Sequence, residues 1–353
     1  CSSDLHKTTG RYRHDKTLQY LSNPDILDLK ISQGQFHVYL QAKIDVKSCE
    51  LVGADALIKY KDDSQFIQSP DKFISILEDS HQIDKIDFFV FEKICQQLQE
   101  WKNANKKLFP ISSHFSRSTF MKSDFLERLE TTVELYDVPK KYLEVEITEN
   151  MFTTNYKEVK ERITQIRSAG FIVSVDDFGI ESSNLALLAT AQFDILKIDK
   201  SFISDVVSNK NTRTVIESMV DVCTKMNIKL IAEGVETKEQ IDFLRSIGCL
   251  RAQGYYYSRP VTRQMMFEIY EDQSIAKGDT KDEIERLINI DDVLNNIHKV
   301  DDIEWYRSAI LRLDAQIFEF DFITGSMRYY DSRLSPQTGE LSKIEVPNYL
   351  QRI

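Results

Sequence analysis

The sequence predicts an α/β protein built as a parallel β/α barrel, with a smaller α+β segment behind it. Apolar strand patterns alternate with amphipathic helical patterns through the middle of the chain, and each strand pattern ends on Asp, Glu, Lys or Gln. The spacings between these polar residues are 30, 21, 36 and 20, counted along Glu146, Asp176, Lys197, Glu233 and Gln253. Strand ends of a parallel barrel meet on one face, where barrel enzymes carry their chemistry.

Two acidic strand patterns come first. Residues 143–149 alternate apolar and acidic side chains, so Glu144 and Glu146 share one face of a strand. The next strand pattern ends on adjacent carboxylates, Asp176 and Asp177, which would each lose several kcal/mol of hydration if buried unpaired. Hard divalent cations prefer carboxylate oxygens, so the pair indicates a cation site. The alternative is an acidic turn that caps a helix.

Three further strand patterns, at 193–199, 229–236 and 252–255, also end on polar side chains. These side chains are Lys197, Asp199, Glu233, Glu236 and Gln253. The helical patterns between the strands cover residues 156–169, 211–226 and 238–247. The regular alternation favours a functional interpretation over separate capping residues, because every polar group lies where its strand ends.

Five motifs occur in an order and spacing that resemble those of the EAL domain, the phosphodiesterase domain that opens cyclic di-GMP to linear pGpG. They are Glu-Ile-Thr-Glu at 146–149, Asp-Asp-Phe-Gly at 176–179, Leu-Lys-Ile-Asp at 196–199, Ala-Glu-Gly-Val-Glu-Thr at 232–237, and Gln-Gly-Tyr at 253–255 with Ser-Arg-Pro at 258–260. The resemblance covers about residues 31 to 269. It implies a modified (β/α)8 barrel in which one strand runs antiparallel, with residues 35–41 in the first strand and 50–60 in the second.

The resemblance also implies roles for individual residues. Catalysis is assigned to Glu233 and Lys197, and anchoring of the loop after residue 179 to Glu149. The implied metal ligands are Asp55, His114, Glu146, Asp176, Asp177, Asp199 and Glu233. The implied substrate-binding residues are Gln41, Lys59, Gln253 and Glu236. An active enzyme of this kind needs a divalent metal, Mg or Mn, whereas a receptor need not bind one.

Two departures from the family pattern lie on the second strand. Asp55 stands where the family has its ligand glutamate, and its side chain is shorter by one methylene, about 1.5 Å. Metal–oxygen distances are held near roughly 2.0–2.6 Å, so this change matters. Lys59 replaces an arginine that grips substrate phosphate, which keeps the charge but loses the bidentate fork.

Two more departures follow. His114 stands where the family carries an asparagine, and imidazole suits manganese or zinc better than magnesium. The alternative is a histidine without metal, solvated or hydrogen-bonded. Glu181 replaces a turn glycine in the loop at 180–185, which couples substrate and metal binding in the family.

Together these features predict a degenerate EAL domain. The second-metal set of Asp176, Asp177, Asp199 and Glu233 matches the family, whereas the side built from Asp55, Lys59, His114 and the 180–184 loop does not. Two-metal hydrolysis requires both cations. We therefore expect weak or absent turnover and a role as a cyclic di-GMP receptor or regulatory module. The alternatives are an active metal-dependent phosphodiesterase and an interaction module without ligand.

Composition limits the partners. The chain has 353 residues and a net charge of −11, which argues against a nucleic-acid polymer or an anionic membrane as the main partner. Its five cysteines are scattered and odd in number, so we expect no disulfide framework and a reducing, cytoplasmic location. The sequence contains no long apolar run and no signal-peptide pattern.

The flanks predict additional segments. The expected domains are a linker or upstream remnant at 1–30, the barrel at 31–270, a linker with a connecting helix at 271–304, and an extension at 305–353. The family often carries a GGDEF domain before the barrel, but that motif is absent here. Residues 316–330 show a hairpin pattern that resembles the opening of a PAS sensor domain; the alternative is a hairpin packed on the barrel. We expect a fragment of a longer chain, with neighbouring signalling domains as partners, and a homodimer.

Overall fold

A computed structural model describes residues 16–63, 67–153, 156–179 and 192–266, and the backbone of three strands between 316 and 344. The chain divides into two compact units, residues 1–285 and 286–353.

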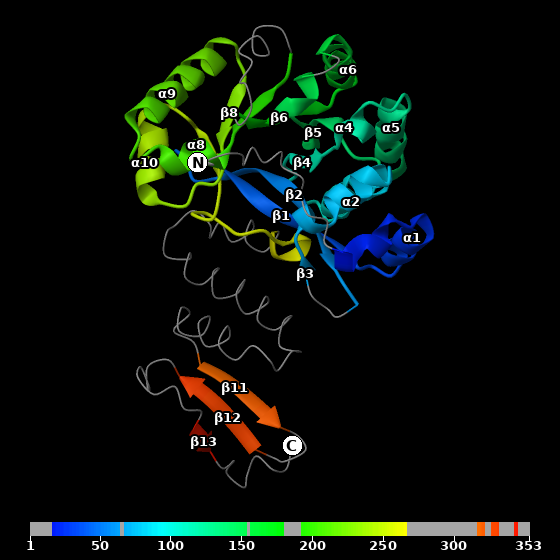
Figure 1. The fold of residues 1–353 in the computed structure, drawn as a ribbon. Coiled ribbons are helices and arrows are strands. Elements are labelled where there is room, and N and C mark those ends of the chain that lie inside the picture. The colour runs from blue at the N-terminus through cyan, green and yellow to red at the C-terminus, as the bar shows by residue number, and fades with distance from the viewer. Residues whose placement is uncertain are drawn as a thin grey trace, which may run out of the picture. The chain divides into compact units, whose positions relative to one another are not determined.

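The first unit contains a closed eight-stranded barrel (Figure 1). Its strands are β1 (Phe36–Asp45), β2 (Leu51–Lys61), β4 (Ile111–His114), β5 (Leu143–Thr148), β6 (Ile172–Phe178), β7 (Ile195–Ile198), β8 (Lys229–Ala232) and β9 (Arg251–Gln253). Neighbours follow chain order, and β9 pairs back to β1. Among these eight strands all pairings are parallel except those of β1, which is antiparallel to β2 and β9. The prediction of a modified barrel with one antiparallel strand is confirmed.

Two short strands, β3 (Ile67–Gln68) and β10 (Val261–Thr262), pair antiparallel with β2 and β1. The helices of the described part are α1 (Pro24–Ser32), α2 (Ile74–Asp79), α3 (Ile83–Asn103), α4 (Arg117–Phe120), α5 (Phe125–Tyr136), α6 (Tyr156–Ser168), α8 (Lys200–Asp205), α9 (Lys210–Lys225) and α10 (Lys238–Ser246). Short 3-10 helices are η1 (Lys16–Ser22), η2 (Pro70–Lys72), η3 (Lys140–Tyr142) and η4 (Glu149–Thr153). The three predicted helices correspond to α6, α9 and α10.

The barrel has an apolar outer layer and a charged interior. Outward residues such as Val145 and Val175 are fully buried beneath the helices. Glu144 and Glu146 occupy the opposite face of β5 and are 1% exposed, as their alternation predicted. Buried charges require partners, so the interior must be a paired network.

Helix α3 holds the segment that follows β4. Asp87 on α3 accepts hydrogen bonds from the Ser116 backbone N–H (2.9 Å) and from its Oγ (2.8 Å). Ser116 is the N-cap of α4 and lies two residues after His114. Burial raises the pKa of Asp87 to about 6. The helix therefore fixes the chain next to the barrel mouth through one buried carboxyl group.

The N-terminal residues differ from the predicted linker. Leu21 in η1 and Leu27 in α1 are fully buried, and the hydroxyl groups of Tyr20 and Tyr60 on β2 lie 2.9 Å apart. Asn23 caps α1 by accepting from the N–H groups of the first turn. Residues 16–30 are therefore folded structure packed on the barrel. The prediction gave weight to the polar and basic residues of the first 24 positions and overlooked the apolar residues from Leu18 to Leu29.

In the second unit, β11 (Gln316–Asp321) and β12 (Ser326–Asp331) form an antiparallel hairpin, and β13 (Ser342–Ile344) pairs with β12. The hairpin pattern at 316–330 is thus realised in the backbone. The predicted linker and connecting helix at 271–304 lie outside the described residues, as does the rest of the predicted extension at 305–353 apart from these three strands. The PAS resemblance stays a prediction.

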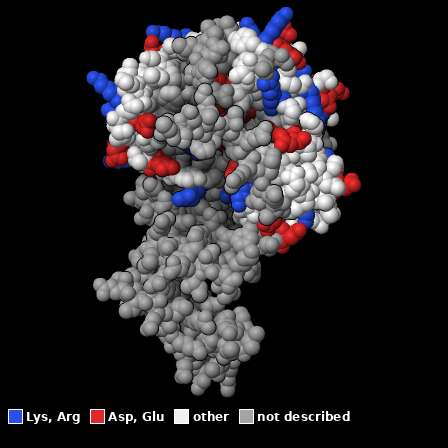
Figure 2. Space-filling view, in the orientation of Figure 1, with Lys and Arg blue, Asp and Glu red and all other residues white. Residues whose placement is uncertain are grey.

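On the face seen in Figure 2, acidic and basic side chains are interspersed over the barrel unit. Among the residues that the structure describes, we find no helix with the length and apolarity needed to cross a membrane.

Candidate active site

The charged interior opens at the carboxyl ends of the parallel strands. The predicted residues found there are Asp55 (β2), His114 (β4), Glu146 (β5), Asp176 (β6), Lys197 (β7), Glu233 (after β8) and Gln253 (β9). Ion pairs and hydrogen bonds join all seven into one network. The barrel therefore converts strand ends that are far apart in sequence into one cluster.

Lys197 is the central cation of this cluster and is fully buried. Its Nζ lies 2.6 Å from Glu233 Oε1, 2.7 Å from Glu146 Oε1, 3.4 Å from Asp55 Oδ2 and 3.6 Å from Asp176 Oδ1. Burial alone would lower the pKa of Lys197, but the surrounding carboxylates raise it well above its ordinary value. One ammonium group thus supports four carboxyl groups.

The Asp55 carboxylate is 2% exposed and receives four donors. Oδ1 accepts from Ser112 Oγ (2.5 Å) and contacts His114 Nε2 (3.1 Å). Oδ2 accepts from Gln253 Nε2 (3.1 Å) and Lys197 Nζ (3.4 Å). Burial would raise the pKa of Asp55, but Lys197 and His114 hold it well below its usual range. The shorter side chain is therefore an ionised group held deep in the barrel by protein donors.

His114 bridges two carboxyl groups at the edge of the cluster. Its Nε2 faces Asp55, and its Nδ1 lies 3.0 Å from Glu146 Oε1. Burial would lower the pKa of His114, but Glu146 and Asp55 raise it to about 10. The ring is 40% exposed, so it also reaches the solvent side of the site. The predicted alternative of a hydrogen-bonded histidine describes this arrangement, and a metal at either nitrogen would replace a proton there.

The same three residues have the spacing of metal ligands. Asp55, His114 and Glu146 each offer one ligand atom, and these atoms lie within 4.8 Å of one another. Across the described ranges this is the only such group of three or more. Two oxygens and one imidazole nitrogen form a donor set that suits manganese or zinc better than magnesium. The residues therefore fit a divalent ion.

The carboxylates that match the family motif are arranged differently. Asp176 Oδ1 accepts the Asp177 backbone N–H, and Asp199 accepts the Ser201 N–H at the start of α8, each at 2.8 Å. Burial and the neighbouring Asp199 raise the pKa of Asp177. Burial raises the pKa of Glu233 to about 8. In the described residues these carboxylates do not form a metal-ligand group of their own.

Glu149 lies where the loop after β6 begins. Its Oε2 accepts the Gly179 backbone N–H at 2.9 Å. Gly179 has φ of 106°, and a Cβ there would lie 2.4 Å from the Phe202 ring, so only glycine fits. Glu149 thus contacts the last described residue before the loop, and its anchoring role stays a prediction. Glu181 and the rest of the 180–184 loop lie outside the described residues.

The implied substrate residues are divided. Gln253 Nε2 also donates to Gln41 Oε1 (3.1 Å), so Gln41 lies in the cluster. The other amide atom, Gln253 Oε1, is buried without a partner among the described residues. Lys59 lies over the Tyr39 ring, 4.3 Å from its centroid. Glu236 is exposed, and its backbone N–H donates to Gln240 in the first turn of α10, outside the cluster.

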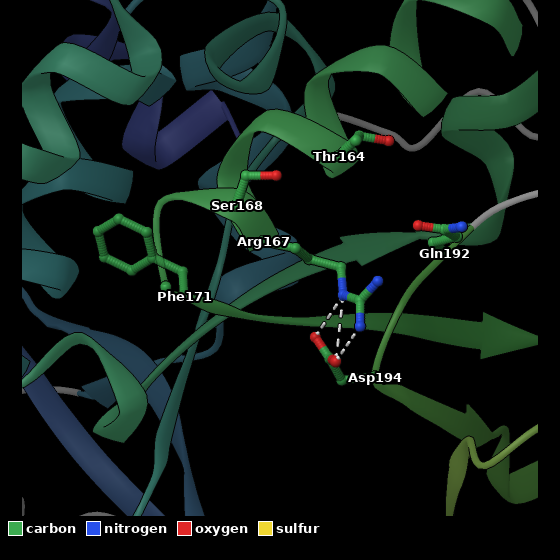
Figure 3. A pocket seen from close by; sticks show the side chains of 7 residues that line it. Thr164, Arg167, Ser168, Phe171, Gln192 and Asp194 are labelled. Atoms are coloured by element: carbon green, nitrogen blue, oxygen red, sulfur yellow. Dashed lines mark hydrogen bonds and ion pairs between the residues drawn. The ribbon is translucent and has the colours of Figure 1, made fainter.

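A hollow of about 310 Å³ lies at the opposite end of the strands (Figure 3). Arg167 and Asp194 line it, and their side chains pair at 2.8 Å. Asp194 also accepts the N–H of Val173, the second residue of β6. Arg167 and Asp194 therefore link α6 to β6, and we assign the hollow a structural role.

A model of the EAL domain matches residues 25–260. This chain belongs to the EAL domain family. It is 33% identical over 231 residues to the oxygen sensor protein DosP of Escherichia coli, covering 65% of this chain and 29% of DosP. It is 27% identical over 246 residues to the cyclic di-GMP phosphodiesterase NbdA of Pseudomonas aeruginosa, covering 70% and 31%. The chain thus spans about a third of the length of these relatives.

Among solved structures, the EAL enzyme Bd1971 bound to cAMP and cyclic di-GMP is similar, with a TM-score of 0.66 and 26% identity. The similarity covers 72% of this chain and 69% of that one. The family match begins at residue 25, inside α1, which agrees with the folded N-terminal segment.

Proposed function

We propose that this EAL domain binds cyclic di-GMP at the carboxyl end of its barrel, turns it over slowly or not at all, and acts in signalling as a receptor or regulatory module. The ligand is supported by the family, by the phosphodiesterase NbdA and by the Bd1971 complex. The observation that carries the reduced activity is the Asp55 carboxylate, which four protein donors occupy. A shorter and fully engaged ligand leaves one metal under-coordinated.

The proposed metal site consists of Asp55, His114 and Glu146, with manganese favoured over magnesium. Further proposed ligands are Asp176, Asp177, Asp199 and Glu233. When bound, divalent ions would supply a water activated near neutral pH and charge that neutralises the phosphodiester. The protein carries a net charge of −11, so a cation at this mouth would also reduce repulsion of the anionic substrate.

The residues of the chain then have separate tasks. Lys197 holds Glu146 and Glu233 in place and offsets their charge. Lys59 attracts phosphate as a point charge, without the two-pronged geometry of arginine. Gln41 and Gln253 form the amide wall of the site, and the unpartnered Gln253 Oε1 is available to a donor or a cation.

The test combines calorimetric titration of cyclic di-GMP with an assay for pGpG, each in magnesium and in manganese. We expect saturable binding and slow turnover, faster in manganese than in magnesium. Rapid magnesium-dependent conversion, at a kcat in the usual enzyme range of about 1–10³ per second, would establish the active phosphodiesterase instead. Absence of binding under all conditions would leave the interaction module as the explanation.

The family relatives are about three times longer than the matched region, so we also propose that ligand occupancy is passed to other domains of a longer chain. A homodimer is proposed as its assembly. Light scattering that shows a monomer at high concentration would remove the dimer from this proposal.

A further inference from the structure

Beneath the cluster lies a second buried lysine that the family motifs did not identify. Lys43 on β1 is 2% exposed and points into the barrel on the side away from the mouth. Its Nζ lies 2.9 Å from Ser112 Oγ, 3.0 Å from Glu144 Oε1 and 3.9 Å from Glu146 Oε2. Burial alone would lower the pKa of Lys43, but Glu144 and Glu146 raise it. The ammonium group is thus charged and held in one place.

The contacts determine the direction of the hydrogen bonds. An ammonium group only donates, so Ser112 Oγ must accept from Lys43. The single Ser112 proton is then left for Asp55 Oδ1 at 2.5 Å, because an ionised carboxylate only accepts. Lys43 therefore orients the hydroxyl group that holds Asp55.

The strand register makes room for this arrangement. Asp55 pairs with Ser112 across β2 and β4, and Gly53 pairs with Lys43 across β1 and β2. A Cβ at Gly53 would lie 3.0 Å from the Pro110 carbonyl oxygen and 3.6 Å from Lys43 Cδ. A side chain at residue 53 would therefore crowd the Pro110 carbonyl group and lie in van der Waals contact with the Lys43 stem.

We propose that Lys43, acting through Ser112, is a positioning residue that sets the place of the Asp55 carboxylate in the cation site. The proposal rests on the proposed function only in taking Asp55 as a ligand. Groups that orient a metal ligand typically change metal affinity by about 10–100-fold when removed. We call the hydrogen bonds from Lys43 to Ser112 and from Ser112 to Asp55 the relay. Without the relay, Asp55 loses the donor on the side away from the mouth, and its carboxylate is no longer fixed.

The experiment uses Mn²⁺ alone as the probe, measured by electron paramagnetic resonance. Because Lys43→Met alone would leave Glu144 buried and unpaired, the comparison is between Glu144→Gln and Lys43→Met/Glu144→Gln. These two proteins differ only at residue 43. Thermal unfolding checks that each variant is folded.

The two explanations of Lys43 predict opposite signs. If Lys43 acted only as a charge, its removal would strengthen Mn²⁺ binding, because a nearby positive charge is lost. The positioning role predicts about ten-fold weaker binding. In a protein that also carries Ser112→Ala, Lys43→Met should not weaken Mn²⁺ binding. Tighter or unchanged binding in the Ser112 protein overturns the proposal.

Ser112→Ala by itself is the mild variant, since it removes one hydroxyl group, and it should weaken Mn²⁺ binding about ten-fold as well. If the unaltered chain binds no Mn²⁺, the proposed metal site fails, and the relay is decided by nuclear magnetic resonance of the metal-free protein. The His114 ring signals should then differ between the two Glu144→Gln proteins, but not in the Ser112→Ala background. Identical ring signals would overturn the relay.

Discussion

The two sides of the charged cluster differ in a way that motif matching does not reveal. One side contains two departures from the family, Asp55 and His114, together with Glu146 from a matching motif, and it brings its ligand atoms within 4.8 Å of one another. The side that matches the family, with Asp176, Asp177, Asp199 and Glu233, forms no such group in the described residues. A matching motif thus guarantees residue types at strand ends, whereas ligand spacing depends on which donors each carboxylate already has.

Lys197→Met should have the largest effect, because Lys197 belongs to both sides at once. Removing one partner of a buried ion pair leaves uncompensated charge and costs roughly 3–5 kcal/mol. Urea unfolding at pH 7 measures the change. Lys225→Met is the matched control, because Lys225 is exposed and pairs with Asp221 on the same helix. Equal stability of the two variants would contradict the view that one cation holds the cluster together.

Asp87→Asn should change how the free energy of unfolding depends on pH. Asp87 lies outside the charged cluster and holds the Ser116 segment beside it, so this variant tests that segment separately from the cluster. The pKa of Asp87 is about 6 in the folded protein and 3.8 as its ordinary value. Between these values the folded state binds more protons, so stability falls as pH rises from about 4 to 6 and then levels off. The lost stability is on the order of 3 kcal/mol.

The measurement for Asp87 is the free energy of unfolding between pH 4.5 and 7.5, compared with Asp87→Asn. Asparagine keeps an acceptor for Ser116, so the cap remains and only the titration is removed. The difference between the two proteins should shrink toward low pH. A difference that does not depend on pH would mean that Asp87 stays ionised in this range.

Asp55→Glu combined with His114→Asn should raise the rate of pGpG formation in magnesium. The longer side chain extends toward the mouth, and the amide supplies the oxygen that magnesium prefers. We expect an increase of about 10–100-fold. Either change alone is the control and should recover less. No increase in the double variant would locate the defect in the loop that begins after Gly179, and restoring glycine at residue 181 would test that.

The choice between metals should give the smallest effect. An imidazole nitrogen favours manganese, so the unaltered chain should bind Mn²⁺ about ten-fold more tightly than Mg²⁺. In His114→Asn this ratio should fall, while Asp177→Asn, on the other side of the cluster, should leave the ratio nearer its original value. A ratio that responds equally to both changes would show that the two sides are not separate.

Much of the site followed from local patterns. The period of two along residues 143–149 placed Glu144 and Glu146 in the interior, and the spacing of strand ends placed Lys197 and Gln253 beside them. The expectation of one antiparallel strand came from the family resemblance, and the structure shows that this strand is β1. The pattern also contained an unused signal: Lys43 interrupts an apolar strand on the same face as Gln41. A period assigns a side chain to a face but names none of its partners.

The sequence by itself determined the barrel, the order of its strands and the chemical types at its mouth, because hydrophobic periodicity and strand-end polarity are local properties. Only the tertiary structure decided that the Asp55 carboxylate contacts four donors, that His114 lies between two carboxyl groups, and that Glu236 faces solvent. The Lys43–Ser112 contact joins residues 69 positions apart. Such contacts exist only once the strands have closed into a barrel and burial has forced each charge to find a partner.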